Sequence, residues 1–219
     1  MPRHFSAATD TVIAASLRDH ADWRRGRIDY AVWLIDAHDA PLRARLAMLR
    51  ARLGDLWLPQ QRAPHLTLHV CGFVAERTVH DDDCPRAALA AQHAALQALA
   101  PPPFELTIGG LDSFDSAAFL AVDDAQHALP PLRAALDAVR PEIRFAPYVP
   151  HLTLGLYAQA WRKDEIRRRH AALPALPPLR LRVSALRLAG YDARDPDSPL
   201  RTLVRLPLHE RTQAGAASP

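Results

Sequence analysis

The chain has 219 residues, of which 49% are hydrophobic and 23% are charged, and its formal net charge is +3. This length and composition suit one domain or two closely packed lobes and exclude a disordered chain. The two cysteines, Cys71 and Cys84, exclude a disulfide framework, and no stretch is apolar enough to span a bilayer or serve as a signal peptide, so we expect a cytoplasmic protein.

The positive charge is carried almost entirely by arginine, because Lys163 is the only lysine. A planar guanidinium matches the oxygens of a phosphate group, which fits an RNA ligand. A chain rich in Ala, Arg, Pro and Leu shows the same bias when its coding sequence is GC-rich. The arginine content alone therefore decides little.

The first half of the chain begins with an irregular or helical N-terminal extension at 1–27. Its arginine cluster at 24–27 is typical of a solvated basic turn or of the flank of a nucleic-acid groove. Apolar and polar periodicity then predicts the following elements: a strand at 28–35, an amphipathic helix at 42–53, a strand at 65–74 and an Ala-rich helix at 85–99.

The second half repeats this alternation of strands and helices. The pattern predicts strands at 104–111, 118–122, 151–157, 179–188 and 202–208, helices at 129–139 and 161–173, a polar loop at 191–199 and a loose tail at 209–219. We therefore expect an α+β fold over 28–208. Its two pseudo-symmetric lobes, each a small, mostly antiparallel sheet with helices outside, would face each other across a central cleft.

The sequence Pro-His-Leu-Thr-Leu occurs twice, at 64–68 and at 150–154, once in each half. Because alternate side chains of a strand share a face, His65 and Thr67 point one way while the leucines point into a core. His151 and Thr153 repeat this arrangement. A single copy is most often a solvated strand, and a duplicated structural strand would also give two copies. However, the polar positions are kept as well as the apolar ones, which favours one shared site.

Two imidazoles across a groove can divide acid and base chemistry. A histidine titrates near ~6.5, so one ring can be free while the other is protonated. Such proton transfers are each worth roughly 10²–10⁴-fold in rate. The threonine hydroxyls can donate hydrogen bonds to anionic oxygens between the rings, and a phosphodiester fits this set without a metal or other cofactor.

His69 lies two residues beyond Thr67, so alternation predicts that it shares the face of His65; in the second copy Gly155 takes its place. It is therefore a candidate ligand contact or an exposed polar residue. Tyr148, just before the second motif, is a candidate for stacking on a base, although aromatic residues are more often buried in the core. Arg62 and Arg144 are the arginines nearest the motifs and the candidates for further phosphate contacts.

The two His-Leu-Thr-Leu segments resemble the signature of the two-histidine phosphoesterases, which include bacterial 2'-5' RNA ligases and RNA 2',3'-cyclic phosphodiesterases. Residues 104–114, with their glycine pair, and the strand at 118–122 resemble the family's central strands, and the resemblance extends over about 28–208. The extension at 1–27 and the proline-rich approach at 145–150 depart from the family pattern.

The resemblance implies a metal-independent enzyme that opens ribose 2',3'-cyclic phosphates to 2'-phosphates. Its substrates would be RNA ends or cyclic nucleotides, with reversible 2'-5' RNA ligation as a second reaction. In this assignment His151 is the base that activates water, His65 is the acid, and Thr67 and Thr153 hold the phosphate. The alternatives are a non-catalytic binder of RNA ends or nucleotides, and a metal hydrolase using His65, His69 and a carboxylate. We expect a monomer.

Overall fold

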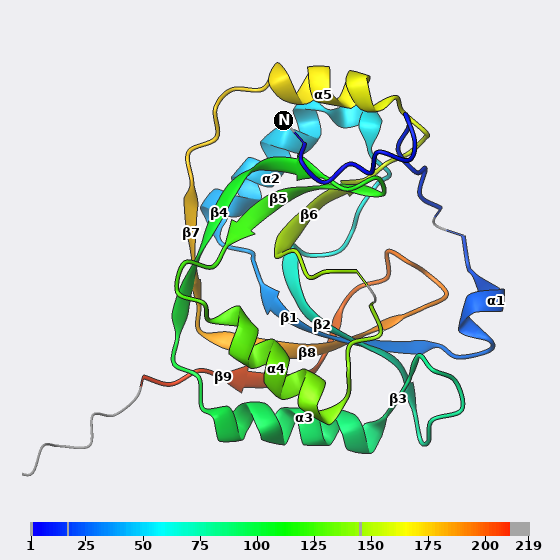
Figure 1. Cartoon of the computed structure of the whole chain (residues 1–219), viewed down its shortest axis with the longest axis vertical. Coiled ribbons are helices and arrows are strands. Elements are labelled where there is room, and N and C mark those ends of the chain that lie inside the picture. The colour runs from blue at the N-terminus through cyan, green and yellow to red at the C-terminus, as the bar shows by residue number, and fades with distance from the viewer. Residues whose placement is uncertain (1, 17, 145, 211–219) are drawn as a thin grey trace, which may run out of the picture.

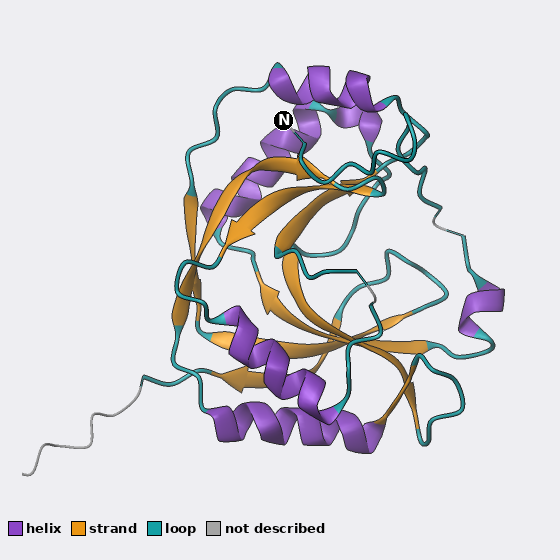
Figure 2. Cartoon of the chain, in the orientation of Figure 1, coloured by secondary structure: helices purple, strands orange, loops and turns teal. Residues whose placement is uncertain are grey.

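The computed structural model describes residues 2–16, 18–144 and 146–210. Its strands are β1 (Asp29–Asp36), β2 (His65–Ala75), β3 (Asp83–Pro85), β4 (Phe104–Ser113), β5 (Ala117–Asp123), β6 (His151–Leu156), β7 (Leu179–Val183), β8 (Ala185–Asp192) and β9 (Arg201–Pro207). Its helices are α1 (Ala21–Arg24), α2 (Ala40–Arg52), the short 3₁₀ helix η1 (Gly54–Leu56), α3 (Arg86–Leu99), α4 (Leu129–Val139) and α5 (Lys163–Ala171). The expected α+β class is confirmed (Figures 1 and 2).

The strands form one strongly curved sheet in the order β7-β4-β5-β6-β2-β1-β8-β9 (Figure 2). All neighbours on this path are antiparallel, and β3 pairs in parallel with β2. The order is pseudo-symmetric about the β6–β2 pair, because β5, α4 and β6 on one side correspond to β1, α2 and β2 on the other. The two expected lobes are therefore the halves of one sheet, and the two motif strands join them.

The helices cross between the lobes. Helix α2 follows β1 in the chain, yet it contacts β6 of the other lobe, where α5 also lies (Figure 1). Helices α3 and α4 pack together against β2 (Figure 1). Each lobe is thus covered by a helix from the other half of the sequence, and a single hydrophobic core runs beneath both. This crossing explains why no flexible linker separates the halves.

The strand expected at 179–188 is two strands. Strand β7 pairs with β4 at one edge of the sheet, and β8 pairs with β1 in the opposite lobe. Ser184 lies at the break and its carbonyl accepts a hydrogen bond from the amide of Leu208 (2.9 Å). Between β7 and β8 the chain passes from one lobe to the other without a break in its apolar alternation. Strand β8 also includes the first two residues of the polar loop expected at 191–199.

Two arginines of the cluster in the N-terminal extension are paired with carboxylates. Arg24 binds Asp19 (2.6 Å), and Arg27 binds Asp82 (2.5 Å) and lies 3.9 Å above the ring of Phe73. These pairs agree with a basic turn rather than with the flank of an open groove. Among the described helices, none has both the length and the apolar character to cross a membrane.

Candidate active site

The two motif strands are neighbours in the sheet. Leu66 of β2 pairs with Leu152 of β6 in antiparallel register. Continued by one residue on each side, this register sets His65 across from Thr153 and His151 across from Thr67. Side chains directly across an antiparallel pair lie about 5 Å apart, and diagonal neighbours about 7–8 Å. The imidazoles therefore occupy the two diagonal corners of a His–Thr quartet.

The quartet faces away from the core. Leu66, Leu68, Leu152 and Leu154 are fully buried in the main hydrophobic cluster, whereas the histidines and threonines are half-buried. The alternation read from the sequence is therefore correct at both motifs. Burial of these four leucines beneath the quartet fixes which face of each strand it occupies, because a one-residue slip would exchange the two faces.

The imidazole rings of His65 and His151 are each oriented by a hydrogen bond to the main-chain carbonyl of the residue two positions earlier. His65 Nδ1 lies 2.9 Å from the carbonyl oxygen of Ala63, and His151 Nδ1 lies 2.7 Å from that of Val149. A carbonyl oxygen can only accept, so Nδ1 must carry the proton in both rings. The remaining nitrogen, Nε2, is left on each ring to exchange a proton with a substrate.

Burial lowers the pKa of both histidines. At His65 the positive charges of Arg62 and Arg187 add to this effect, while the bond to Ala63 and the charge of Asp36 oppose it. At His151, Arg144 and His65 are among the charges that add to it, while the bond to Val149 opposes it. Both rings therefore favour the neutral form.

A cavity of about 370 Å³ opens beside His65 and Thr67. Its other lining residues are Tyr30, Val32, Arg62, Val70, Ile143, Arg144, Tyr191 and Leu200. The structure thus brings both arginine candidates to the first motif. Arg62 stacks on the ring of Tyr191 (4.1 Å) and donates from Nε to the carbonyl of Ser198 (3.0 Å), while its buried Nη2 has no partner among the described residues.

The expectation that His69 shares the face of His65 is wrong. In the β1–β2 ladder Leu34 pairs with Thr67 but the preceding Trp33 pairs with His69, so β2 holds one extra residue there. This β-bulge turns His69 to the opposite face of the sheet. Its side chain is 1% exposed, and its Nε2 lies 3.0 Å from Asp137 of α4. His69 is therefore neither a substrate contact nor an exposed residue.

The bulge is held by charged side chains that the sequence did not single out. Arg133 of α4 donates to the carbonyl of Leu68 (2.5 Å), and Glu142 accepts from the amide of Val70 (3.0 Å). The two side chains also bind each other (2.7 Å). No signal in the single sequence marks these partners, because the bulge that leaves the two main-chain groups unpaired is itself not visible there.

Tyr148 does not line the cavity beside His65. Its hydroxyl donates to the carbonyl of Thr67 (3.0 Å), and Arg133 lies 3.8 Å above its ring. With one face covered by a guanidinium and the hydroxyl bound to β2, the ring is suited to holding Thr67 in place rather than to stacking on a base.

Asp36 and Arg187 form a further pair beside the site. Asp36 stands across from His65 in the β1–β2 ladder and binds Arg187 of β8 (2.6 Å). The strand expected at 28–35 stops one residue short of Asp36, which is the last residue of β1. Among the described residues, no three His, Cys, Asp or Glu side chains gather in a way that could hold a metal ion.

The model of the 2'-5' RNA ligase superfamily matches residues 32–195 of this chain. The chain belongs to this superfamily. The match covers both motifs, so the resemblance to two-histidine phosphoesterases is confirmed, and it leaves the first 31 residues outside. No curated protein matches the chain.

Several solved structures share the fold of this chain. Escherichia coli LigT complexed with 3'-AMP superposes with a TM-score of 0.61 at 18% identity, covering 84% of this chain and 99% of that chain. A crystal structure of a phosphoesterase gives a TM-score of 0.56 at 18% identity, with coverage of 84% and 99%. A protein of Thermus thermophilus gives 0.51 at 20% identity, with coverage of 84% and 100%. At these identities the likeness establishes the fold alone.

Proposed function

We propose that this protein is a metal-independent phosphodiesterase that opens ribose 2',3'-cyclic phosphates to 2'-phosphates. One observation carries the proposal: two histidines on adjacent strands have their Nδ1 atoms bound to main-chain carbonyls, so both Nε2 atoms remain for chemistry on the same face. A threonine lies across from each ring. This is the arrangement required to activate one oxygen and protonate another on opposite sides of a phosphorus atom.

In the forward reaction His151 accepts a proton from water at Nε2 while the water oxygen forms a bond to phosphorus. The bond from phosphorus to the 3' oxygen breaks, and His65, protonated at Nε2, gives its proton to that oxygen. The products are a 2'-phosphate and a 3'-hydroxyl. The hydroxyls of Thr67 and Thr153 donate to the non-bridging oxygens, whose negative charge grows in the transition state. The two rings end with exchanged protonation states.

The cavity beside His65 supports a nucleotide substrate. Arg62, which lines the cavity, and the exposed side chain of Arg144 supply cationic donors for phosphate oxygens, and the aromatic wall formed by Tyr30 and Tyr191 suits a sugar or base. LigT structures complexed with 3'-AMP, ATP and NADP+ share this fold, which supports nucleotides or RNA ends as the class of ligand.

Ligation would use the same chemistry with a different nucleophile. The 5'-hydroxyl of a second RNA end would give its proton to His151 and attack the phosphorus in place of water. The bond to the 3' oxygen would break, and His65 would protonate that oxygen, which leaves a 2'-5' linkage and a 3'-hydroxyl. Water at ~55 M favours hydrolysis, so ligation requires two RNA ends held together.

The test is incubation with a panel of 2',3'-cyclic mononucleotides and of oligonucleotides ending in a cyclic phosphate, followed by identification of the phosphate position in the product. We expect 2'-phosphates, formed equally well with a chelator. The variants His65→Ala and His151→Ala should each lose at least about 10²-fold in kcat while remaining folded. The matched control is His38→Ala, an exposed histidine outside the site.

Three results would contradict the proposal. A 3'-phosphate product would mean that the other oxygen leaves. Loss of activity with a chelator and its return with zinc or manganese would support a metal hydrolase. Tight binding of a cyclic nucleotide with no product after long incubation would support the non-catalytic binder.

A further inference from the structure

The N-terminal segment 2–16, which precedes the residues matched by the family model, is docked on the β6 lobe (Figure 1). Lys163 anchors it. This side chain is 2% exposed, and its ammonium group donates to the carbonyl of Ser6 (2.7 Å) and to Thr9 (3.1 Å) and pairs with Asp115 (2.8 Å). A buried ammonium is stable only when it is paired and hydrogen-bonded in this way. The only lysine of the chain thus holds the segment in place.

The main chain adds further anchors. Val12 donates to the carbonyl of Trp161 (2.9 Å), Ile13 to that of Asp115 (2.7 Å) and Ala15 to that of Tyr157 (2.8 Å). The side chain of Val12 is buried in a small hydrophobic cluster with residues of β5 and α5. The segment therefore has a defined position, and the groups at its start are held at a fixed place on the lobe.

The start of the segment is bound to Asp112 at the end of β4. One carboxylate oxygen accepts from the main-chain amide of Arg3 (2.7 Å) and the other lies 2.9 Å from His4 Nδ1. Asp112 is 6% exposed, whereas the side chain of His4 is 37% exposed. The carboxylate fixes the imidazole by one nitrogen and leaves Nε2, at the other edge of the ring, available to a ligand.

Strand register places this pair on the face of the quartet. Asp112 pairs with Phe119 of β5, and Phe119 pairs with Thr153 of β6, so the three side chains form one row across three neighbouring strands. Strands lie about 4.8 Å apart, which sets Asp112 roughly 10 Å from Thr153 along the row. This separation is of the order of one nucleotide of an RNA strand.

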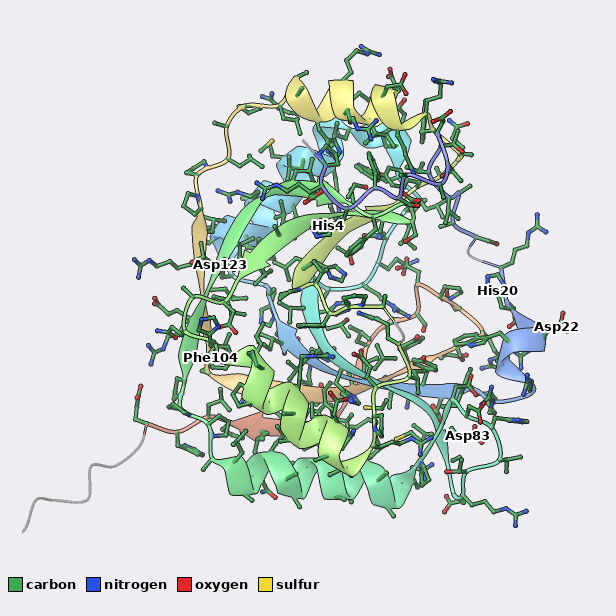
Figure 3. The ribbon with its side chains drawn as sticks, viewed as in Figure 1. His4, His20, Asp22, Asp83, Phe104 and Asp123 are labelled. Atoms are coloured by element: carbon green, nitrogen blue, oxygen red, sulfur yellow. The ribbon has the colours of Figure 1, made fainter. Side chains whose placement is uncertain are left out.

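Aromatic packing links His4 with the second catalytic candidate. The ring of His4 lies 5.6 Å from the ring centroids of both Phe114 and Phe119, and the same two rings lie 5.1 and 5.2 Å from His151. Figure 3 shows His4 beside β5 and β6, whereas His20 of the same extension lies far away near α1. His4 is thus a third imidazole at the edge of the site, on the side opposite the cavity of Arg62.

We propose that Arg3 and His4 form a subsite for the phosphodiester that joins the reacting nucleotide to the next one in an RNA strand. This rests on the proposed function. The cationic side chain of Arg3 and the free imidazole nitrogen of His4, one nucleotide from the threonine that holds the reacting phosphate, suit a second phosphate group. The N-terminal segment thereby makes the site select RNA ends over free cyclic mononucleotides.

The test compares kcat/KM for a cyclic mononucleotide with kcat/KM for a short oligonucleotide ending in the same cyclic phosphate. His4→Asn is the decisive variant, because its amide nitrogen can replace Nδ1 in the bond to Asp112 while nothing replaces Nε2. We expect the oligonucleotide-to-mononucleotide ratio to fall about tenfold. Arg3→Ala should lower the ratio too, and should weaken the salt dependence for the oligonucleotide by about the slope of one phosphate contact, ~0.7. The exposed His20→Ala should leave the ratio unchanged.

A ratio that stays the same in His4→Asn would overturn the subsite, whether both activities fall together or neither changes. If the wild-type protein turns over neither substrate, the proposed function fails separately. Binding of an oligonucleotide with a 2'-phosphate end, measured by fluorescence anisotropy, then tests the subsite: wild-type affinity in His4→Asn would overturn it, and weaker binding would support it.

Discussion

The hydroxyl of Tyr148 donates a hydrogen bond to the main-chain carbonyl of Thr67, 3.0 Å away. Tyr148 precedes the second motif and Thr67 belongs to the first, so this bond ties the loop that enters β6 to the strand of the other lobe. It lies directly before the bulge that turns His69 away from the site. The bond therefore holds the last residue of β2 that faces the cavity before the bulge.

We expect Tyr148→Phe to lower the free energy of unfolding by about 1 kcal/mol and kcat several-fold, because Thr67 loses the support of its carbonyl. The matched control is Tyr157→Phe, which removes another buried hydroxyl bond, to Ser113, away from the quartet. It should cost similar stability without lowering kcat. Denaturant unfolding and turnover of a cyclic mononucleotide measure both effects. Equal losses of kcat in the two variants would contradict a positioning role for Tyr148.

The pH profile of kcat/KM should be bell-shaped with its optimum on the acid side of ~6.5. In the free enzyme one histidine must be protonated and the other neutral, and burial lowers the pKa of both. Activity is lost with rising pH as the acid deprotonates, and with falling pH as the base protonates. In the complex the phosphate anion favours the imidazolium, so the optimum of kcat should lie at higher pH. A kcat/KM optimum above pH 7 would contradict this assignment.

Folding stability should fall as the pH drops from about 6.5 towards 4 because of His170. Burial lowers the pKa of this half-buried histidine to about 4, and neither ring nitrogen has a hydrogen-bond partner among the described residues. In this window the unfolded chain takes up a proton that the folded state does not, which costs up to about 3 kcal/mol. His170→Phe should remove this dependence, measured by denaturant unfolding at pH 5 and pH 7. His38→Phe, an exposed histidine, is the control; a pH dependence unaltered in His170→Phe would exclude this histidine as the cause.

Gly72→Ala should destabilise the protein by more than about 2 kcal/mol. Gly72 has φ +112°, and a Cβ there would lie 2.3 Å from the carbonyl oxygen of Asp82, which accepts the amide of Phe73. Both the backbone conformation and the close approach require glycine. Gly110 meets nothing within 4 Å and serves as the control. Thermal unfolding measures the difference, and equal melting temperatures for the two variants would show that the strand relaxes freely.

Sequence periodicity predicted the quartet because a strand with one buried face alternates apolar and polar residues, and this alternation shows which side chains face the core. The same logic failed two residues later at His69, where a bulge reverses the alternation without any glycine or proline to mark it. It also failed at Ser184, because β7 and β8 continue one alternating pattern while pairing with strands of different lobes. Which strands pair with one another is decided by tertiary structure, so it cannot be read from the local sequence. The same holds for the packing of α2 against the opposite lobe.

The docking of the N-terminal segment was beyond prediction for a related reason. Lys163 and Asp115 look like ordinary surface charges in the sequence, and their role depends on contacts with Ser6 and Thr9 more than 100 residues away. His4 gave no signal either, because it belongs to no motif. Residues 211–219 of the expected tail lie outside the described residues.

The direct pairing of β2 with β6 has a consequence for how the protein handles ligands of different size. Since both rings flank the Leu66–Leu152 pair at which the two strands meet, their separation is set by the backbone pairing at that point. A bulkier ligand cannot be accommodated by spreading the imidazoles apart. Adaptation to new ligands must therefore come from the surrounding loops and the chain start, where insertions leave the reacting geometry intact.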